Sequence, residues 1–392
     1  MLVSYRALLG RDGARSLALA CGLGWLSYSG YGLAIILAVY SGTRSFATAG
    51  AAVAAFSVGS GLVAPTRGRL VDRRGPRALG YLATGHLLAA VLLLIGCSGG
   101  QNSVLLFSGA GLAGACAPPI IATARSMWTD VAGADLARTG HALNAALADA
   151  AQIASPALTG TLALLASPSA ALATLVVGAV SASWLLAIRE RRVVLPGVSR
   201  RRAHRIWGVL SESAGLRTIV VGDLAIGGWL AGLEVAVTTV AAATGVPELG
   251  ALPLAASALG SIVLSIWSGT RRSKQSAGWR YVAGSIIVAT ALPLTLLSPS
   301  VGAIAAILVL AGAGFGLLNV AVFELLDQVA PADRATEAFT WLTTSQAAGM
   351  AIGAAAAGRL AQISPTDPLL LIIAFAALAA AIAIARRHSL GA

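Results

Sequence analysis

The sequence predicts an all-α integral membrane protein with twelve transmembrane helices in two pseudo-symmetric six-helix halves. Three observations support this prediction. The composition is 57% hydrophobic and only 11% charged, apolar runs recur along the whole chain, and the basic residues gather in one set of loops. An apolar run of about 20 residues can cross the ~30 Å hydrocarbon core as a helix, in which every backbone polar group is satisfied.

The predicted helices follow the apolar runs of the sequence. The first six cover residues 15–41, 46–66, 78–97, 103–128, 136–166 and 168–188, and the last six cover residues 216–243, 248–270, 279–298, 301–327, 333–363 and 367–386. The first run is too long for the apolar region of a signal peptide, so we expect it to be a retained helix. Residues 1–188 then form an N-terminal half, residues 189–215 a basic cytoplasmic linker and residues 216–392 a C-terminal half.

The distribution of charge predicts the orientation. A net charge of +12 would suggest nucleic-acid binding in a soluble protein. Here, only Arg44 and Arg359 are placed on the outer side, which leaves 27 − 2 = 25 of the 27 lysines and arginines inside. This asymmetry follows the positive-inside rule and predicts cytoplasmic termini in the plasma (inner) membrane. It also favours contact with anionic lipids of the inner leaflet and argues against a nucleic-acid partner.

Several other function classes lack their sequence signals. The four histidines and the three cysteines show no metal-ligand or disulfide spacing. A phosphate-binding Gly-Lys-Ser/Thr loop, which an ATP-driven pump requires, is absent from the sequence. We therefore expect no metal, no cofactor and no enzymatic activity, although an intramembrane enzyme stays the main alternative class. A channel or receptor is possible in principle, but a duplicated six-plus-six plan favours a transporter.

A weak internal repeat supports the duplicated plan. Arg138 precedes Ala142-Leu143 at the start of the fifth predicted helix, and Arg334 precedes Ala338-Phe339 at the start of the eleventh. The separation, 334 − 138 = 196 residues, is half of the 392-residue chain. Two halves related by an axis along the membrane normal are one of the architectures that transporters use.

The most informative segment joins the second and third predicted helices. It reads Gly68-Arg69-Leu70-Val71-Asp72-Arg73-Arg74-Gly75-Pro76-Arg77. Five arginines between positions 67 and 77 cannot enter lipid cheaply, and two glycines allow a tight turn. Asp72 is the only acid among these cations, so we expect it to have a specific partner. This segment resembles the loop between the second and third helices of the major facilitator superfamily of transporters.

Three further stretches resemble the same superfamily, and particularly a drug/proton-antiporter-like branch that is common in high-GC actinobacteria. In the fifth helix, Ser155, Pro156 and Gly160 match part of an antiporter-associated packing motif, with Ser155 in the place of a usual glycine. The other stretches are residues 230–235 and 330–358. The arginine that many drug/proton antiporters carry in the fourth helix is absent from residues 107–114.

The resemblance implies a mechanism and a set of roles. Two halves would rock around a central substrate site, and the protein would act as a monomer. The gating motif would comprise Gly68, Asp72, Arg73, Gly75 and Arg77. The Asp72 carboxylate would meet the N-terminus of the eleventh helix across the inner seam, and Arg73 and Arg77 would pair with acids such as Asp130.

Ionisable groups inside predicted membrane helices are costly and therefore candidates for function. Asp149, near the middle of the fifth helix, and Glu234, in the outer part of the seventh, are the proton-coupling candidates. A carboxylate in a low-dielectric setting can bind and release a proton near neutral pH. The alternative for both is a structural acid. A second set of acids lies nearer the inner helix ends, where we expect them to cap helices or pair with loop arginines across the interface between the halves: Asp223, Glu324, Asp327 and Glu337.

Polar and aromatic residues at mid-helix are the candidates for the substrate cavity. They are Tyr28, Tyr31, Asn144, Gln152, Trp229, Asn319, Trp341 and Gln346. The alternative roles are hydrogen bonding between helices for the amides and anchoring at the membrane interface for the tryptophans. Because no basic residue is expected at mid-membrane, a neutral, amphipathic or cationic substrate is favoured. The sequence thus predicts a proton-coupled exporter, with a proton-coupled importer of a small metabolite as the alternative.

Overall fold

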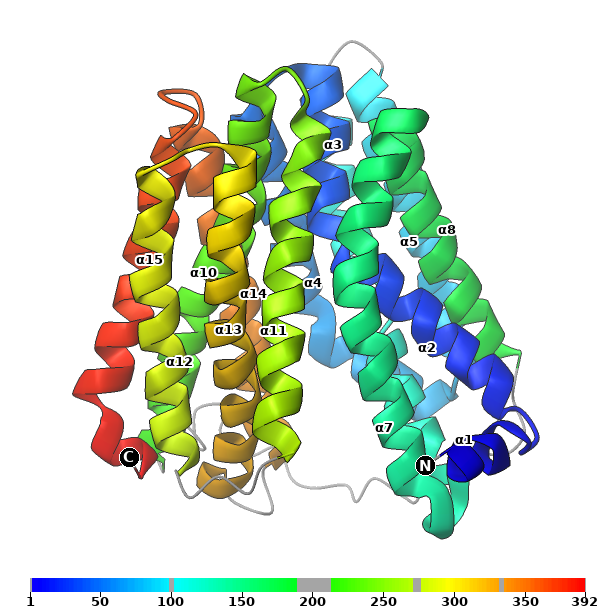
Figure 1. The fold of residues 1–392 in the computed structure, drawn as a ribbon. Coiled ribbons are helices and arrows are strands. Elements are labelled where there is room, and N and C mark those ends of the chain that lie inside the picture. The colour runs from blue at the N-terminus through cyan, green and yellow to red at the C-terminus, as the bar shows by residue number, and fades with distance from the viewer. Residues whose placement is uncertain (1, 99–101, 189–212, 271–275, 331–334, 392) are drawn as a thin grey trace.

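The structure is a computed structural model that describes residues 2–98, 102–188, 213–270, 276–330 and 335–391, and these residues contain helices and no strand. The α-helices, labelled as in Figure 1, are α1 (Leu2–Leu9), α2 (Ala14–Ser29), α3 (Tyr31–Thr43), α4 (Phe46–Arg74), α5 (Arg77–Ser98), α6 (Ser103–Cys116), α7 (Ile120–Leu165), α8 (Pro168–Ala187), α10 (Ala214–Ala243), α11 (Ala251–Thr270), α12 (Ala277–Ala291), α13 (Val301–Val329), α14 (Ala335–Leu360) and α15 (Asp367–Ala385). Short 3-10 helices precede α11 (Pro247–Gly250) and follow α12 (Leu292–Leu296) and α15 (Arg387–Leu390). The all-α prediction is confirmed.

Most of these helices are long and apolar enough to cross a membrane. In the described residues nine segments pass a test of length and hydropathy, and the bent pair α2 and α3 makes a tenth span. The predicted fifth and eleventh helices correspond to the second part of α7 and to α14, which run through the bundle with the others (Figure 1). The hydropathy of these two helices is lower than that of the other crossings because they carry predicted polar site residues. These are Asn144, Asp149, Gln152, Ser155 and Gln346.

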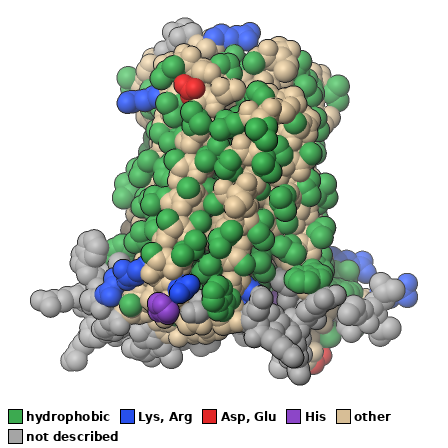
Figure 2. All heavy atoms as spheres, turned by 60° about the vertical axis from the view of Figure 1, so that its left-hand side comes forward, with side chains coloured by type: hydrophobic (Ala, Val, Ile, Leu, Met, Phe, Trp, Pro, Cys, Tyr) green, Lys and Arg blue, Asp and Glu red, His purple; other side chains and the backbone are tan. Residues whose placement is uncertain are grey.

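The surface has the pattern of a protein embedded in lipid. Figure 2 shows apolar side chains across the middle of one face of the molecule, with Lys and Arg side chains gathered toward its two ends. Both chain termini lie at the same end of the bundle (Figure 1), which we call the terminal end. The opposite end, where α3 leads into α4, is the far end. The linker predicted at residues 189–215 lies almost entirely outside the described residues.

Three helix boundaries differ from the predicted ones. The first helix is broken at Gly30 into α2 and α3, which are bent by 47°. The fourth predicted helix is divided between α6 and the start of α7, and the fifth forms the rest of α7. Helix α7 begins at Ile120 and contains a non-helical residue, Gly133 with φ 63°. The second helix continues to Arg74, so that Gly68 lies inside α4 and the predicted loop is reduced to Gly75 and Pro76. The loop prediction was therefore too long, because the arginines that leave the lipid continue the helix.

Each set of six crossings has a core of its own, and a third core joins them. One cluster of buried apolar residues draws only on residues 8–186 and another only on residues 216–390. We call α1–α8 the first half and α10–α15 the second half. A further cluster contains buried residues of both halves, among them Tyr31 and Phe46 of the first and Val235 and Ala354 of the second.

The halves approach most closely through backbone contacts near the far end. A Cβ added to Gly358 on α14 would lie 3.1 Å from the Cα of Gly50 on α4. The Nε2 of Gln362 donates to the Oγ of Ser45 at 3.3 Å on the same seam. At a second contact between the halves, a Cβ on Gly160 of α7 would lie 2.6 Å from the Cβ of Ala251 on α11. In Figure 1, α7 and α11 draw apart toward the terminal end.

Candidate functional site

The candidate site centres on Glu234, which lies where the two halves meet. Glu234 is on α10, and its carboxylate reaches Gly32 on α3: a Cβ added to Gly32 would lie only 2.6 Å from the Cδ of Glu234. The Oε2 atom of Glu234 is buried and has no hydrogen-bond partner among the described residues. Burying a carboxylate without a partner is costly when it is ionised, so a proton on Glu234 would relieve that cost. This acid was a predicted proton-coupling residue.

The break in the first crossing gives Glu234 a particular neighbour. Since α3 begins at Tyr31, Gly32 belongs to its first turn. The first backbone N–H groups of a helix lack intrahelical acceptors, and the helix dipole is positive there. Amides at this place would stabilise an ionised carboxylate, whereas removal from water would destabilise it. The balance between these two effects depends on how closely α3 and α10 approach.

Ser155 supports the break at Gly30. The backbone N–H of Gly30 donates to the carbonyl of Tyr28. The Ser155 hydroxyl donates to the carbonyl of Leu26 at 2.6 Å. A Cβ on Gly30 would lie 2.7 Å from the Oγ1 of Thr159, so a side chain does not fit there. Ser155 thus does more than replace a packing glycine, because it supplies a hydrogen bond to the broken helix.

The other residues of the predicted packing motif lie nearby on α7. Pro156 is buried inside the helix. Gly160, one turn further, faces Ala251 and the backbone oxygen of Glu248, which a Cβ would approach to 3.1 Å. The motif therefore serves the contact of α7 with both α2 and the second half.

A second polar cluster gathers around the break between α6 and α7. The Tyr28 hydroxyl donates to the carbonyl of Pro118 at 2.7 Å. Tyr31 is bonded through its hydroxyl to Nε2 of His86 at 2.5 Å, and Nδ1 of His86 is 2.7 Å from the carbonyl of Ala113. The two tyrosine rings lie 6.1 Å apart between centroids. Two predicted cavity residues are thus brought together, with their hydroxyls bound to the protein.

Arg67 completes this cluster, which corrects its placement in a cytoplasmic loop. Its side chain is 7% exposed, inside α4. Nη1 donates to the carbonyl of Gly114 at 2.9 Å and to that of Ala117, and Nη2 donates to the carbonyl of Ser60 at 2.8 Å. The guanidinium therefore ties α4 to the end of α6, where the carbonyl of Gly114 also accepts from the backbone N–H of Ala117 at 3.2 Å. Neither Arg67 nor His86 was expected at a site, although a histidine inside the apolar run 78–97 was a visible signal.

The predicted residues of the fifth helix lie on α7 with different surroundings. Asp149 is half-buried and Gln152 is exposed. Asn144 is half-buried, and its Oδ1 accepts from the indole N–H of Trp25 at 3.4 Å. The amide therefore ties α7 to α2, as in the alternative reading. The coupling role of Asp149 stays a prediction.

The predicted cavity residues of the second half do not share one environment. Trp229 is 1% exposed in the core of that half, and its ring meets Phe315 edge-on at 5.5 Å between centroids. Trp341 is partly buried against the same core. Asn319 is exposed on α13. Gln346 is half-buried on α14, where its backbone oxygen faces Gly227. Their contact with substrate stays a prediction.

The gating motif is only partly described. Gly75 has φ 70°, which glycine adopts easily, and it ends α4 before α5 begins. Arg73 and Arg77 are exposed. Gly68 has open space around its Cα. The Asp72 side chain and residues 331–334, its expected partner region, lie outside the described residues, as does any contact between them.

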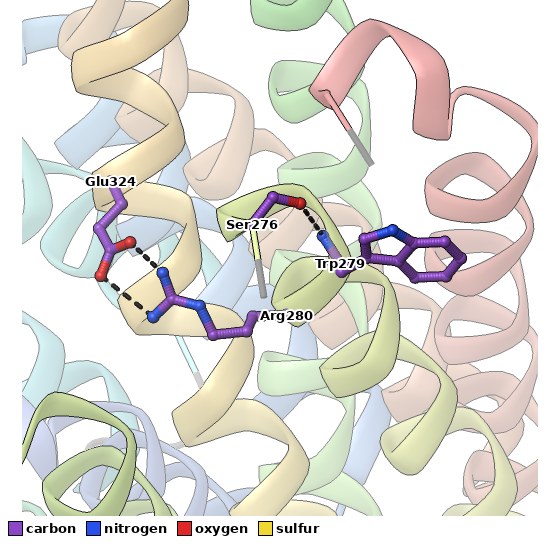
Figure 3. A network of polar contacts seen from close by, with 4 residues as sticks. All are labelled: Ser276, Trp279, Arg280 and Glu324. Carbon is purple, nitrogen blue, oxygen red and sulfur yellow. Dashed lines mark hydrogen bonds and ion pairs between the residues drawn. The ribbon is translucent and has the colours of Figure 1, made fainter. Parts of the chain in front are cut away.

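Glu324 was expected to cap a helix or to pair with a loop arginine across the interface between the halves, and it instead pairs with a helix arginine of its own half. Its carboxylate accepts from Nη1 of Arg280 at 3.1 Å and also from Nη2, as Figure 3 shows. Arg280 lies in the first turn of α12, in the same half, and is 9% exposed. The Oγ of Ser276 caps this helix by accepting from the backbone N–H of Trp279 at 3.3 Å (Figure 3). The pair joins α12 to α13 within the second half.

The remaining acids near the terminal end have varied surroundings. Asp223 is 5% exposed on α10, beside the buried Tyr281. Asp327 is exposed on α13. Glu337 lies in the first turn of α14, where its Oε1 is buried without a hydrogen bond in the described part of the chain. Within the described residues no three His, Cys, Asp or Glu side chains are placed to hold a metal ion.

One ion pair stands outside the membrane-spanning segments. Nη2 of Arg11 donates to Oδ2 of Asp135 at 2.6 Å, and Nη1 donates to the carbonyl of Ala132. The hydrogen bond from Arg11 lowers the pKa of the Asp135 carboxyl below its ordinary value. This pair ties the segment after α1 to the bend of α7 at Gly133.

These features define a multi-pass membrane protein with a buried carboxylate between two helical halves. A family model described as Major Facilitator Superfamily matches residues 17–354. The chain therefore belongs to the major facilitator superfamily, and it is a secondary transporter. No curated protein matches the sequence.

Solved transporter structures share the fold at low sequence identity. The nucleoside transporter NupG is 13% identical, with a TM-score of 0.70 over 95% of this chain and 98% of that chain. A bacterial homologue of the iron transporter ferroportin, in an inward-facing state, is 14% identical, with a TM-score of 0.72 over 95% of this chain and 98% of that chain. The peptide transporter POT in complex with sulfate is 14% identical, with a TM-score of 0.71 over 96% and 94%.

Proposed function

We propose that this transporter is proton-coupled and exports a small neutral, amphipathic or cationic molecule by alternating access. The observation that carries the proposal is the buried carboxylate of Glu234 against the first turn of α3. A proton-coupled transporter needs a group whose protonation changes the relative energies of its two states. Glu234 has the position for this role, because it lies between helices of opposite halves.

The coupling step follows from the surroundings of Glu234. With the halves in contact, the carboxylate is desolvated, so that a proton favours this arrangement. When α10 moves away from α3 and water enters, the ionised form becomes cheaper and the proton leaves. Asp149 on α7 is a second candidate, because it is half-buried at the middle of a crossing. Residues 1–188 and 216–392 would move as two units in a monomer.

The orientation belongs to the same proposal. The terminal end would face the cytoplasm of a cell with this protein in its plasma membrane, as the positive-inside rule predicts. The seam near the far end, with Gly50 against Gly358, would then close the extracellular side. Gln362 and Ser45 would seal the rim of that seam through their 3.3 Å hydrogen bond.

The distribution of fixed charge favours the proposed substrate class. Among the described residues, Arg67 and Arg280 are buried and bound to protein acceptors, Arg67 in the cluster around Tyr28 and Arg280 in the first turn of α12. The buried contact of α10 with α3 carries instead the acid Glu234. A cationic or neutral ligand would compete with the proton there, whereas an anion would meet a like charge.

The test is proton movement in liposomes that contain the purified full-length chain. Amphipathic and cationic dyes and antibiotics are added as a panel, and a pH-sensitive dye reports protons exchanged for each compound. We expect Glu234→Gln to abolish proton exchange while ligand binding persists. Glu248→Gln, an acid in the short helix before α11, is the matched control and should behave as wild type. Asp149→Asn tests the second candidate beside it.

The outcomes separate the possible readings. Proton exchange that survives in both acid variants would overturn coupling through these carboxylates. Uptake driven by an inward proton gradient would show a symporter, the alternative function. Counterflow of substrate against an inward gradient would support export. No proton movement with any transported compound would overturn the proton-coupled proposal.

A further inference from the structure

A cleft outside the seam lies between the start of α5 and the end of α8. It has a volume of about 370 Å³ and is lined by Arg77, Tyr81, Trp184, Ala187 and Ile188. The indole of Trp184 can reach over α5 because position 80 is glycine: a Cβ there would lie 3.1 Å from Cη2 of the ring. The lining side chains are open, since Tyr81 is 68% and Trp184 is 45% exposed.

The cleft opens onto the face of the bundle that meets lipid. α5 and α8 pack side by side and both are candidate membrane spans. The exposed residues of α5 recur at alternating steps of four and three, which places them on one stripe along the helix: Arg77, Tyr81, Thr84, Leu88, Val91 and Ile95. On α8, Val177, Trp184 and Ile188 are exposed in the same way. Apolar stripes therefore lead along both helices to the cleft.

The cleft itself has the chemistry of a membrane interface. Tyr and Trp concentrate at the level of lipid headgroups, where one end of the side chain is apolar and the other wet. Arg77 brings a positive charge to the same level, at the terminal end of α5. A guanidinium has five N–H donors, so it can bind a phosphate while keeping a protein partner. The Tyr81 hydroxyl and the Trp184 indole N–H are further donors at the cleft.

We propose that this cleft is a binding site for the headgroup of an anionic phospholipid, with Arg77 on the phosphate and the acyl chains along the stripes of α5 and α8. Binding at this site differs from the general attraction of basic loops for anionic lipid, because it depends on the side chains that line one cleft. It does not depend on proton coupling. It predicts that the transporter keeps an individual lipid at one position on its first half.

The experiment is native mass spectrometry of the full-length protein in detergent, titrated with phosphatidylglycerol or with phosphatidylcholine. We expect one phosphatidylglycerol to bind more tightly than the rest. Arg77→Ala should weaken that binding about tenfold, since a hydrogen bond from a guanidinium to a phosphate contributes roughly that factor. Arg387→Ala, an exposed arginine at the same end of the second half, is the control. Equal loss in both variants would overturn the site, because only general charge would then matter.

A second readout covers the case in which Arg77→Ala alters the fold. Phosphatidylglycerol with brominated acyl chains should quench Trp184, and Trp184→Phe should remove that part of the quenching while thermal stability is kept. Equal quenching by brominated phosphatidylcholine would overturn the preference for anionic lipid. Competition by soluble glycerol phosphate would show that the cleft takes a free phosphate and would overturn the lipid assignment. All of these measurements are made without transport, so they stay independent of the proposed proton coupling.

Discussion

The carboxylate of Glu234 on α10 occupies the space that a side chain at Gly32 on α3 would fill. These two residues belong to opposite halves, so the missing side chain at Gly32 is what allows the acid to reach the first turn of α3. The backbone of α3 therefore lies beside a buried carboxylate that has an unpartnered oxygen. A glycine on one half and an acid on the other form a single contact.

Gly32→Ala should therefore imitate the loss of Glu234. The new methyl group meets the flexible end of a side chain, so the carboxylate moves away and the fold loses only about 1 kcal/mol. We expect proton exchange to fall to a small fraction of wild type while expression and thermal stability are nearly kept. Gly302→Ala, where an added Cβ meets no atom within 4 Å, is the control. Proton exchange at the wild-type level in Gly32→Ala would contradict a role for this contact.

Arg67 gives a second prediction, because its bonds need the shape of a guanidinium. Arg67→Lys keeps the charge but cannot span Ser60 on α4 and Gly114 on α6 together. Losing these charge-assisted hydrogen bonds inside the bundle should cost about 1.5–3 kcal/mol, seen as a lower midpoint of thermal unfolding. Arg69→Lys, on an exposed position of the same helix, should change stability by less than about 0.5 kcal/mol. Equal midpoints for the two variants would show that the Arg67 network contributes nothing to stability.

Periodicity and charge were enough to predict the helical fold. A stretch of apolar residues specifies a crossing whatever its neighbours are, and the loop motif at residues 68–77 indicated the superfamily. The acid Glu234 could also be found, since a carboxylate inside an apolar run stands out. These predictions share a property: each depends on residues that are close together in the sequence.

Features that depend on contacts between distant helices could not be predicted. The break at Gly30 packs against Ser155 and Thr159 of α7, more than 100 residues away. Arg67 looked like part of a basic loop, because only the carbonyls at the end of α6 show why it can be buried. The pairing of Glu324 within its own half could not be predicted for the same reason, since α12 brings Arg280 to it.

The Arg11–Asp135 pair predicts a pH dependence outside the membrane. The hydrogen bond from Arg11 lowers the pKa of Asp135 in the folded protein. A lowered pKa means that the contact stabilises the fold above the ordinary aspartate pKa of about 3.9 and is lost as the pH falls through the lower, folded value. Hydrogen-exchange protection near Ala132, corrected for intrinsic rates, should be constant from about pH 7 to 5 and fall only below about pH 3.9. Asp135→Asn should remove this acid transition, and a transition of the same size in that variant would assign it to another group.

The Arg280–Glu324 pair gives the last prediction, which separates a stabilising ion pair from a tolerated one. Arg280 is 9% exposed whereas the Glu324 side chain is 43% exposed, so removing the acid leaves the more deeply buried charge without its partner. Glu324→Gln should cost about 2 kcal/mol, and Asp327→Asn, an exposed acid one turn along α13, should cost less than about 0.5 kcal/mol. Adding Arg280→Met to Glu324→Gln should restore part of the loss, because the unpaired charge is removed and the apolar contacts of the side chain are kept. Thermal unfolding of the four proteins measures this, and a double variant that is less stable than Glu324→Gln would show that Arg280 stabilises α12 through contacts other than this carboxylate.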